Sequence, residues 1–344
     1  MIIVVSDHGA RIGKEGERLY VSYPSREKSR SYVSALRLEQ VIVEAKATLT
    51  SGAIDLLTSY GIPALFLRGG KPVGILHSYV GHGTVKVRRA QILAYESPTG
   101  SLFIKEVLLG AIENKRNLLR RLIKNRQLKD KIERKLQRKV DILESIANKK
   151  IPDVGKRPIT FLRNELFALE GSAAETYFSA LQTIIDPHFG FTNRNRRPPR
   201  DPINSLLSYG YAILTMKVLN GVLVAGLEPY AGFLHTDRSG KPSFVLDLVE
   251  EFRQPIVDRL ILRLEGKGVF SNEDFEKEGA MCKIKEGLKK HYLTELFEVF
   301  TEKMENHSTG KTMTFEQHII HQARQAGKYF KGDIIQYKPF IMKR

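Results

Sequence analysis

The chain has 344 residues and a formal net charge of +17, from 55 Lys and Arg against 38 Asp and Glu. At roughly 150 residues per domain, this length corresponds to about two domains. The charge points to a polyanionic partner, with nucleic acid as the first candidate and a generally basic surface as the alternative. A single cysteine, Cys282, excludes intrachain disulfides and metal sites that need several thiolates. Any metal must therefore be held by histidine and carboxylates.

The first hundred residues are predicted to be β-rich. Short segments of alternating apolar residues, separated by glycine and polar turns, occur around residue 4 and over 10–13, 18–22 and 40–44. A short helix over 51–60 precedes a buried strand over 62–67. The apolar run at 1–5 is too short for a signal peptide and is predicted to be a strand.

Residues 104–146 combine helical spacing with dense positive charge. Residues 101–150 carry 15 Lys and Arg against 6 Asp and Glu, a net charge of +9. More than half of the net charge of the chain therefore lies in one short region. Such a helix can be a solvated face, a phosphate-binding face or both.

From residue 160 onward the chain is predicted to be almost wholly helical. Candidate helices cover 161–184, 202–227, 244–264, 272–278, 281–303 and 315–328. The segment 202–227 contains one charge, Lys217, and is long enough to span a bilayer. Proline, asparagine and glycine interrupt it, which favours the central helix of a globular domain. We therefore expect no membrane span and a cytoplasmic protein.

A loop before residue 201 is rich in arginine and contains no acidic residue. Its four arginines are Arg194, Arg196, Arg197 and Arg200. Guanidinium groups on an irregular backbone suit contacts with phosphates. A structural role, in which these arginines pair with carboxylates of neighbouring helices, is equally compatible with the segment.

Glu170 lies on the apolar stripe of the predicted helix 161–184. It follows Leu166 by four residues and precedes Ala174 by four. A carboxylate on a stripe that faces the core must be paired, protonated or bound to a metal ion. A buried salt bridge is the alternative to a functional role.

One histidine and three acids follow in the next part of the chain. His235 ends an apolar loop of glycine and proline turns, and the acids Asp247, Glu250 and Glu251 begin 12 residues later. Asp247 and Glu250 are three residues apart and share a face of the predicted helix 244–264, although a solvated face is the alternative. Carboxylates with one imidazole form a mostly oxygen site, which suits Mn²⁺ or Mg²⁺ better than zinc. On a basic protein, such ions suggest phosphodiester chemistry, whereas a structural core histidine is the alternative for His235.

The order of these motifs resembles the CRISPR-associated integrase/endonuclease family, CRISPR-associated protein 1. The resemblance covers most of the chain and rests on the segments 7–10, 61–67, 169–174, 193–211, 226–235, 247–253, 322–324 and 337–340. No single segment decides it, but the ordered set is specific.

The resemblance implies an α+β fold, in which an N-terminal β-sandwich-like domain is followed by a larger all-α catalytic domain. Residues 1–95 would form the first domain, which dimerises, and residues 96–344 the second. The metal ligands would be Glu170, His235 and Glu250, with Asp247 as a neighbouring active-site carboxylate. The arginine loop would bind nucleic acid.

The implied function is that of a metal-dependent DNA endonuclease/integrase, which inserts short duplex DNA into a CRISPR array by 3′-OH transesterification. The implied partners are double-stranded DNA, a second copy of the chain and CRISPR-associated protein 2. Two other functions stay open from the residues alone. One is a non-catalytic, basic nucleic-acid-binding or architectural protein, and the other is a metal-dependent nuclease that acts mainly on RNA.

Overall fold

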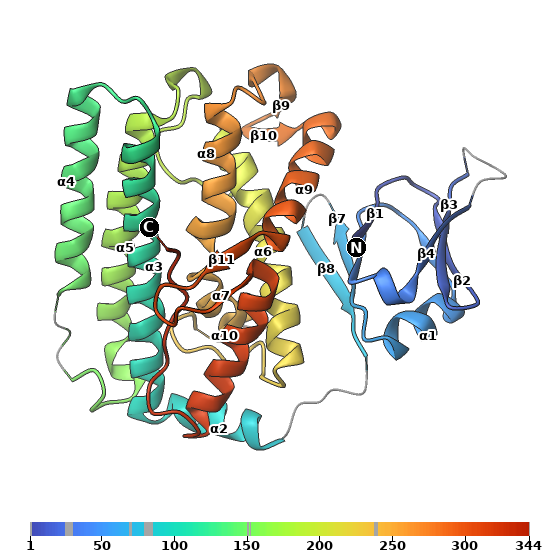
Figure 1. Ribbon diagram of the computed structural model, residues 1–344, viewed down its shortest axis with the longest axis horizontal. Helices are drawn as coiled ribbons and strands as arrows, with labels where there is room; N and C mark the ends of the chain where they lie inside the picture. The colour runs from blue at the N-terminus through green and yellow to red at the C-terminus, as the bar shows by residue number, and fades with distance from the viewer. Residues whose placement is uncertain are drawn as a thin grey trace. The chain divides into compact units, whose positions relative to one another are not determined.

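The computed structural model describes residues 2–24, 30–68, 71–78, 85–149, 151, 153–236 and 240–343. The chain forms two compact units, residues 1–82 and 83–344. Strands predominate in the first unit and helices in the second (Figure 1), which confirms the predicted fold class. The helix α2 (Val85–Tyr95) belongs to the second unit, whereas the predicted N-terminal domain extends to residue 95.

Two four-stranded sheets make up the N-terminal unit. The first has the order β1 (Ile2–Val5), β5 (Gln40–Val43), β7 (Ala64–Arg68) and β8 (Lys71–Leu76). The second has the order β4 (Arg30–Ser34), β3 (Arg18–Ser22), β2 (Arg11–Glu15) and β6 (Thr48–Leu49). Both sheets and the helix α1 (Ser51–Ser59) contribute to one core, in which Ile12, Val41 and Leu57 are fully buried. The shared core agrees with the predicted sandwich.

Three long helices lie side by side in the second unit (Figure 1): α3 (Pro98–Asn125), α4 (Asp130–Ala147) and α5 (Ile159–Ile184). The continuous helix predicted over 104–146 is therefore wrong, because the chain leaves the helix at Arg126 and turns back as α4. The side chain of Arg126 fixes this turn by donating to the carbonyl of Leu262 at 2.6 Å and to Glu265 at 2.7 Å.

The helix α6 (Pro202–Val224) is buried on most of its faces. Pro202 occupies its first turn, and the Asp201 carboxylate accepts from the backbone N–H of Asn204 at 2.9 Å. Of the helices in the described residues, α6 alone is long and apolar enough to cross a membrane, and 61% of that apolar stretch is buried inside the fold. A helix that is apolar all round belongs to the core of a large domain, as the sequence predicts.

The segment that carries the acids is broken rather than one long helix. Where a helix over 244–264 is predicted, the chain forms α7 (Ser243–Val249), a π-helical segment η3 (Arg253–Asp258) and α8 (Arg259–Gly266). The break falls between Val249 and Arg253, with Glu250 as the C-cap of α7. Irregular turns of this kind are frequent at functional sites.

The second unit also contains two strand pairs, so the prediction of an all-α domain is wrong in this detail. A 3-10 turn, η4 (Asn272–Asp274), and the pair β9 (Phe275–Glu278) and β10 (Met281–Ile284) replace the predicted helix over 272–278 and the start of the one over 281–303. Gly279 adopts φ +58 in the turn between them, a conformation that favours a hairpin over a helix. The other α-helices and strands of this unit in the described residues are α9 (Glu286–Thr301), β11 (Lys303–Glu305), β12 (Thr312–Thr314) and α10 (Phe315–Phe330).

Candidate active site

Asp247 holds the loop that carries His235. One of its carboxylate oxygens accepts from the backbone N–H groups of Phe233 at 2.7 Å and Leu234 at 3.2 Å. The other oxygen accepts from the backbone N–H of His235 at 3.0 Å and contacts His235 Nδ1 at 2.7 Å. Because Asp247 is fully buried with four donors, its oxygens have no free direction for a ligand. Asp247 is therefore a positioning residue, and not a residue of a solvated helix face.

The contact with Asp247 determines which ring nitrogen of His235 carries the proton. A buried carboxylate favours the proton on Nδ1, which leaves the lone pair of a neutral ring on Nε2. The Phe167 ring lies nearly perpendicular to the imidazole, with the two ring centroids 5.9 Å apart. The imidazole is 19% exposed, so Nε2 is the nitrogen that is left for a ligand.

Glu250 is buried and paired with a cation. Its Oε1 lies 3.0 Å from Nη2 of Arg253, three residues later in the chain. Burial by itself raises the pKa of Glu250, but the positive charges of Arg253 and Lys115 outweigh burial and hold its pKa below the ordinary value. Glu250 is therefore a carboxylate in its charged form at neutral pH.

Glu170 is half-buried on α5 and is influenced by the charges of Glu250, Lys115 and Arg253. Burial raises the pKa of Glu170, and the negative charge of Glu250 raises it further. Lys115, Arg253 and Arg196 act in the opposite direction. Two carboxylates that repel each other in a partly buried place are a setting that a cation stabilises.

Lys115 is a buried cation that sequence reasoning missed. It lies on α3, four residues after Ala111 and four before Leu119, on the face that packs into the core. Burial lowers the pKa of Lys115, while the charges of Glu250 and Glu170 favour its charged form. Its position on an apolar stripe is the signal that could have identified it, because the same signal drew attention to Glu170.

The three predicted ligands influence one another electrostatically, but their side chains do not form a metal-binding group. The charge of His235 acts on Glu250, and the charge of Glu250 acts on Glu170. Among the residues that the structure describes, however, no three His, Cys, Asp or Glu side chains are close enough to hold one ion.

The arginine loop divides into one inward and three outward side chains. Arg194 donates to Asn204 Oδ1 at 2.8 Å and Ser208 Oγ at 3.1 Å, and its guanidinium lies 5.5 Å from the centroid of the Tyr211 ring. Burial lowers its pKa to about 10. The outward side chains are exposed: Arg196, Arg197 and Arg200. Of these three, Arg196 is the one whose charge acts on both Glu170 and Glu250.

Tyr211 and Tyr177 are buried and both donate to Asp258, and sequence reasoning missed this cluster. Asp258 accepts from the hydroxyl of Tyr211 at 2.6 Å and from that of Tyr177 at 2.9 Å. The Tyr211 ring lies against Arg194 and also against Arg253, whose guanidinium is 4.9 Å from the ring centroid. Tyr211 therefore links the arginine loop to the cation that pairs with Glu250.

Glu251, next to Glu250, anchors the C-terminal segment. Its carboxylate accepts from the Tyr337 hydroxyl at 2.6 Å, the Phe340 backbone N–H at 2.8 Å and the Gln322 amide at 3.0 Å. Burial raises the pKa of Glu251 to about 7, although these hydrogen bonds oppose the shift. Its role is to hold the fold beside the site.

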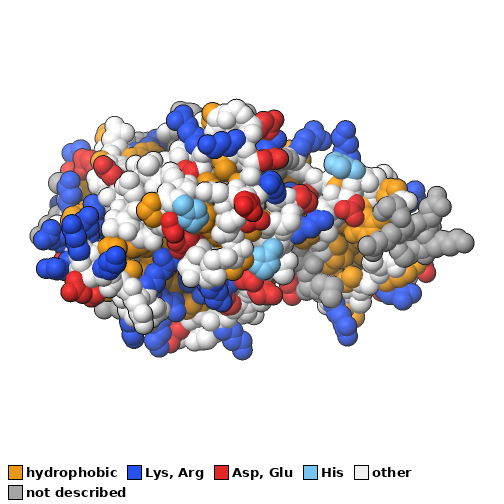
Figure 2. Space-filling view, turned by 90° about the horizontal axis from the view of Figure 1, so that it is seen from above, with side chains coloured by type: hydrophobic (Ala, Val, Ile, Leu, Met, Phe, Trp, Pro, Cys, Tyr) orange, Lys and Arg blue, Asp and Glu red, His pale blue; other side chains and the backbone are white. Residues whose placement is uncertain are grey.

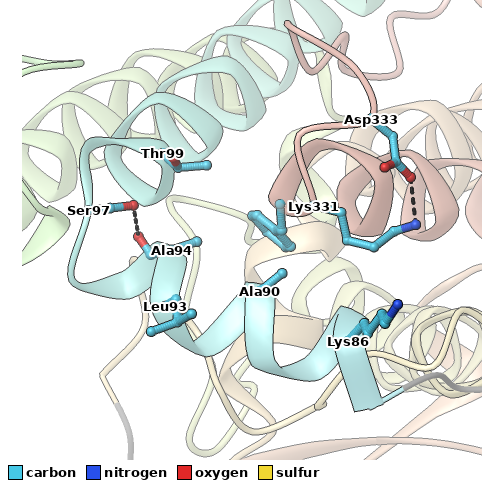
Figure 3. Close-up of a pocket in the computed structure, with 9 residues that line it drawn as sticks. Lys86, Ala90, Leu93, Ala94, Ser97, Thr99, Lys331 and Asp333 are labelled. Atoms are coloured by element: carbon cyan, nitrogen blue, oxygen red, sulfur yellow. Dashed lines mark hydrogen bonds and ion pairs between the residues drawn. The ribbon is translucent and has the colours of Figure 1, made fainter.

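A pocket of the second unit lies apart from these residues. Figure 3 shows it between α2, the start of α3 and the chain that follows α10, where Lys331 pairs with Asp333 at 2.5 Å. Its lining includes Lys86, Leu93 and Thr99 but none of the predicted site residues. The carboxylates and the imidazole therefore belong to a different surface.

Comparison with known proteins gives one consistent result. The family model described as CRISPR associated protein Cas1 matches residues 3–298. A relative from Archaeoglobus fulgidus, named CRISPR-associated endonuclease Cas1 1, is 31% identical, with all of both chains covered.

Solved structures share the fold at lower identity. A casposase bound to integration product is 21% identical with a TM-score of 0.79, over 98% of this chain and 92% of that one. A chain of a Cas6-RT-Cas1–Cas2 complex is 22% identical with a TM-score of 0.76, over all of this chain and 36% of that one. Because the family model and the full-length relative agree with the order of the motifs, the chain belongs to the CRISPR-associated protein Cas1 family.

Proposed function

We propose that this chain is a metal-dependent DNA endonuclease/integrase that inserts short duplex DNA into a CRISPR array by 3′-OH transesterification. The observation that carries the proposal is the electrostatic interaction of Glu170 with Glu250 and of Glu250 with His235, whose imidazole contacts Asp247 through Nδ1. Membership of the Cas1 family and the endonuclease name of the relative from A. fulgidus support it.

The donors of the site fit a hard divalent cation. Two carboxylates and one imidazole nitrogen are an oxygen-rich set that suits Mn²⁺ or Mg²⁺. Glu170, His235 through Nε2, and Glu250 would hold the ion, and the repulsion between the two carboxylates is what its charge would relieve. When bound, such an ion supplies positive charge to a phosphoryl oxygen and increases the acidity of a coordinated hydroxyl.

The other residues prepare the site for that role. Asp247 fixes the ring of His235 and keeps a proton on Nδ1. Arg253 and Lys115 keep Glu250 ionised inside the fold. Arg196, exposed beside both carboxylates, would contact the phosphate next to the reacting one, and Arg197 and Arg200 would bind phosphates farther along the strand.

The proposed assembly follows the names of the related structures. We propose that the chain acts as a homodimer through its N-terminal domain, residues 1–95, and binds CRISPR-associated protein 2 and double-stranded DNA. The casposase bound to integration product and the Cas6-RT-Cas1–Cas2 complex support the DNA and the protein partner, respectively. We place this activity in the cytoplasm.

The decisive experiment compares ligand variants with a matched control on the same helix. Glu170→Ala and His235→Ala should each lower strand transfer and nuclease activity in Mn²⁺ or Mg²⁺ by about 100-fold or more. Mn²⁺ binding, measured by electron paramagnetic resonance, should weaken in both variants. Glu175→Ala removes an exposed carboxylate of α5 and should leave both measurements unchanged.

The same assay tests the competing functions. Parental activity in both ligand variants, with DNA binding unchanged, would contradict the proposed site. A matched RNA substrate that is cleaved faster than DNA would favour an RNA nuclease. Metal-independent binding with no strand transfer in the parental protein would favour an architectural role.

A further inference from the structure

The basic region of residues 101–150 divides between two helices that use their charge differently. On α3 several cations are buried or paired: Lys115 is buried, and Arg116 lies 2.9 Å from Glu144. Arg120 lies near the same Glu144, at 3.8 Å, and Arg126 pairs with Glu265. These cations stabilise the packing of the helices and are not free for a ligand.

On α4 the cations face outward. Lys131, Arg134, Lys135 and Arg138, here named the α4 stripe, are all exposed. Their spacing of three, four and seven residues places them on one helix face. The opposite face is apolar and packs into the fold through Leu136, Val140 and Leu143.

No carboxylate of the described residues forms an ion pair with any member of the α4 stripe. The contact that the structure gives is from Arg134 Nε to the backbone carbonyl of Asp130 at 3.3 Å. Asp141, on the flank of the helix, is engaged by the Gln137 amide at 2.8 Å. Like charges four residues apart repel each other, so the stripe is a surface that an external anion would stabilise.

The space-filling view agrees with this division. Figure 2 shows Lys and Arg side chains gathered at the end of the second unit where Figure 1 places α4.

We propose that the α4 stripe binds the phosphate backbone of duplex DNA outside the active site. The inference rests on the proposed function, which makes duplex DNA the polyanion that this chain meets. The stripe is about 10 Å long at 1.5 Å per residue, and a duplex of that length carries about six phosphate charges. Four cations in a row match such a segment, and α4 packs against α5, the helix that carries Glu170.

Binding without catalysis tests the proposal. The variant in which Lys131, Arg134, Lys135 and Arg138 are all replaced by Gln is compared with the parental protein on a labelled 30-base-pair duplex. Fluorescence anisotropy is recorded in EDTA over a range of salt concentrations, so that the result does not depend on metal-dependent chemistry. We expect affinity to fall at least about 10-fold near 0.1 M salt. The slope of log K against log salt should become shallower by about 3.6, which is about 0.9 for each of four phosphate contacts.

A matched control removes the effect of total charge. Four exposed lysines elsewhere in the second unit, Lys267, Lys277, Lys285 and Lys290, are changed to Gln in a second variant. The control should change the slope by less than about 1. Equal losses of affinity in both variants would show that net charge alone drives binding and would overturn the proposal that the α4 stripe binds DNA.

Folding and alternative partners are checked in the same proteins. Gln is a good helix former, so the circular dichroism and Tm of the stripe variant should match those of the parent. The paired variants Lys131→Gln/Lys135→Gln and Arg134→Gln/Arg138→Gln should each give about half of the change in slope. Parental DNA binding in the fully substituted variant would refute the proposal and leave an acidic protein surface as the partner.

Discussion

The α4 stripe and the site around Glu170 and Glu250 concentrate charge in opposite ways. The stripe exposes four cations that have no carboxylate partner among the described residues. In the site, Asp247 has four donors and Glu250 has Arg253. Water and salt screen exposed like charges at little cost, whereas a buried charge needs a partner. Changes in the stripe should therefore alter binding alone, and changes in the site should alter stability as well.

The largest effect is expected at Asp247. Asp247→Asn replaces one accepting oxygen by an amide that faces N–H donors, so buried donors lose their partner. We expect a loss of about 3 kcal/mol or more in the free energy of unfolding, measured by urea denaturation. Metal affinity should fall about 10- to 100-fold because His235 loses its orientation. The control Asp141→Asn, on the exposed flank of α4, should change neither quantity. An Asp247→Asn protein as stable as the parent would contradict the claim that buried charges of the site stabilise the fold.

Glu251 should make stability depend on pH. Its pKa is about 7 in the folded state against an ordinary value of 4.5, so the folded protein binds more protons between these limits. Stability from this group is complete below about pH 4.5 and is lost as pH rises through 7, a change of about 3 kcal/mol.

Glu251→Gln tests this pH dependence because it keeps an accepting oxygen but cannot ionise. The difference in unfolding free energy between parent and variant should shift in favour of the variant from pH 4.5 to 8. A constant difference over that range would show that Glu251 has an ordinary pKa.

Two arginines of one loop sharpen the contrast between inward and outward charge. Arg194→Gln removes charged hydrogen bonds to Asn204 and Ser208 and should cost about 2 kcal/mol of stability. Arg196→Gln changes an exposed side chain and should leave stability within about 0.5 kcal/mol while weakening DNA binding. Thermal unfolding and DNA-binding anisotropy, measured on both variants, test these expectations. Equal losses of stability and of DNA affinity in the two variants would contradict the assignment of Arg194 as inward and Arg196 as outward.

The smallest effect compares two tyrosine–carboxylate bonds of the same length. Tyr211 donates to buried Asp258 at 2.6 Å, and Tyr60 donates to exposed Glu17 at 2.6 Å. Tyr211→Phe should cost about 1 to 2 kcal/mol of stability, because Asp258 keeps the donors Tyr177 and Gln254. Tyr60→Phe should give no measurable change, since water replaces the lost bond. Equal costs would mean that burial does not set the strength of these bonds.

The sequence by itself determined some of the long helices and the order of the motifs. Periodic apolar spacing predicted α5 and α6 closely, because a helix with one buried face leaves that pattern in any window of the chain. The ordered motifs indicated the family and named Glu170, His235 and Glu250 as ligands. They also directed attention to Asp247, although only the tertiary structure decided that its oxygens are fully used by the loop.

The tertiary structure alone decided which charges lie inside. The apolar stripe of α3 includes Lys115, but periodicity does not show which segments cover that stripe, and it favoured a solvated face for acids that are buried. It also missed the break at Glu250 and the hairpin around Gly279. Local spacing fixes which residues share a face. Burial and charge pairing depend on segments far apart in the chain, such as α3 against the turn after α7, and these meet only in the folded protein.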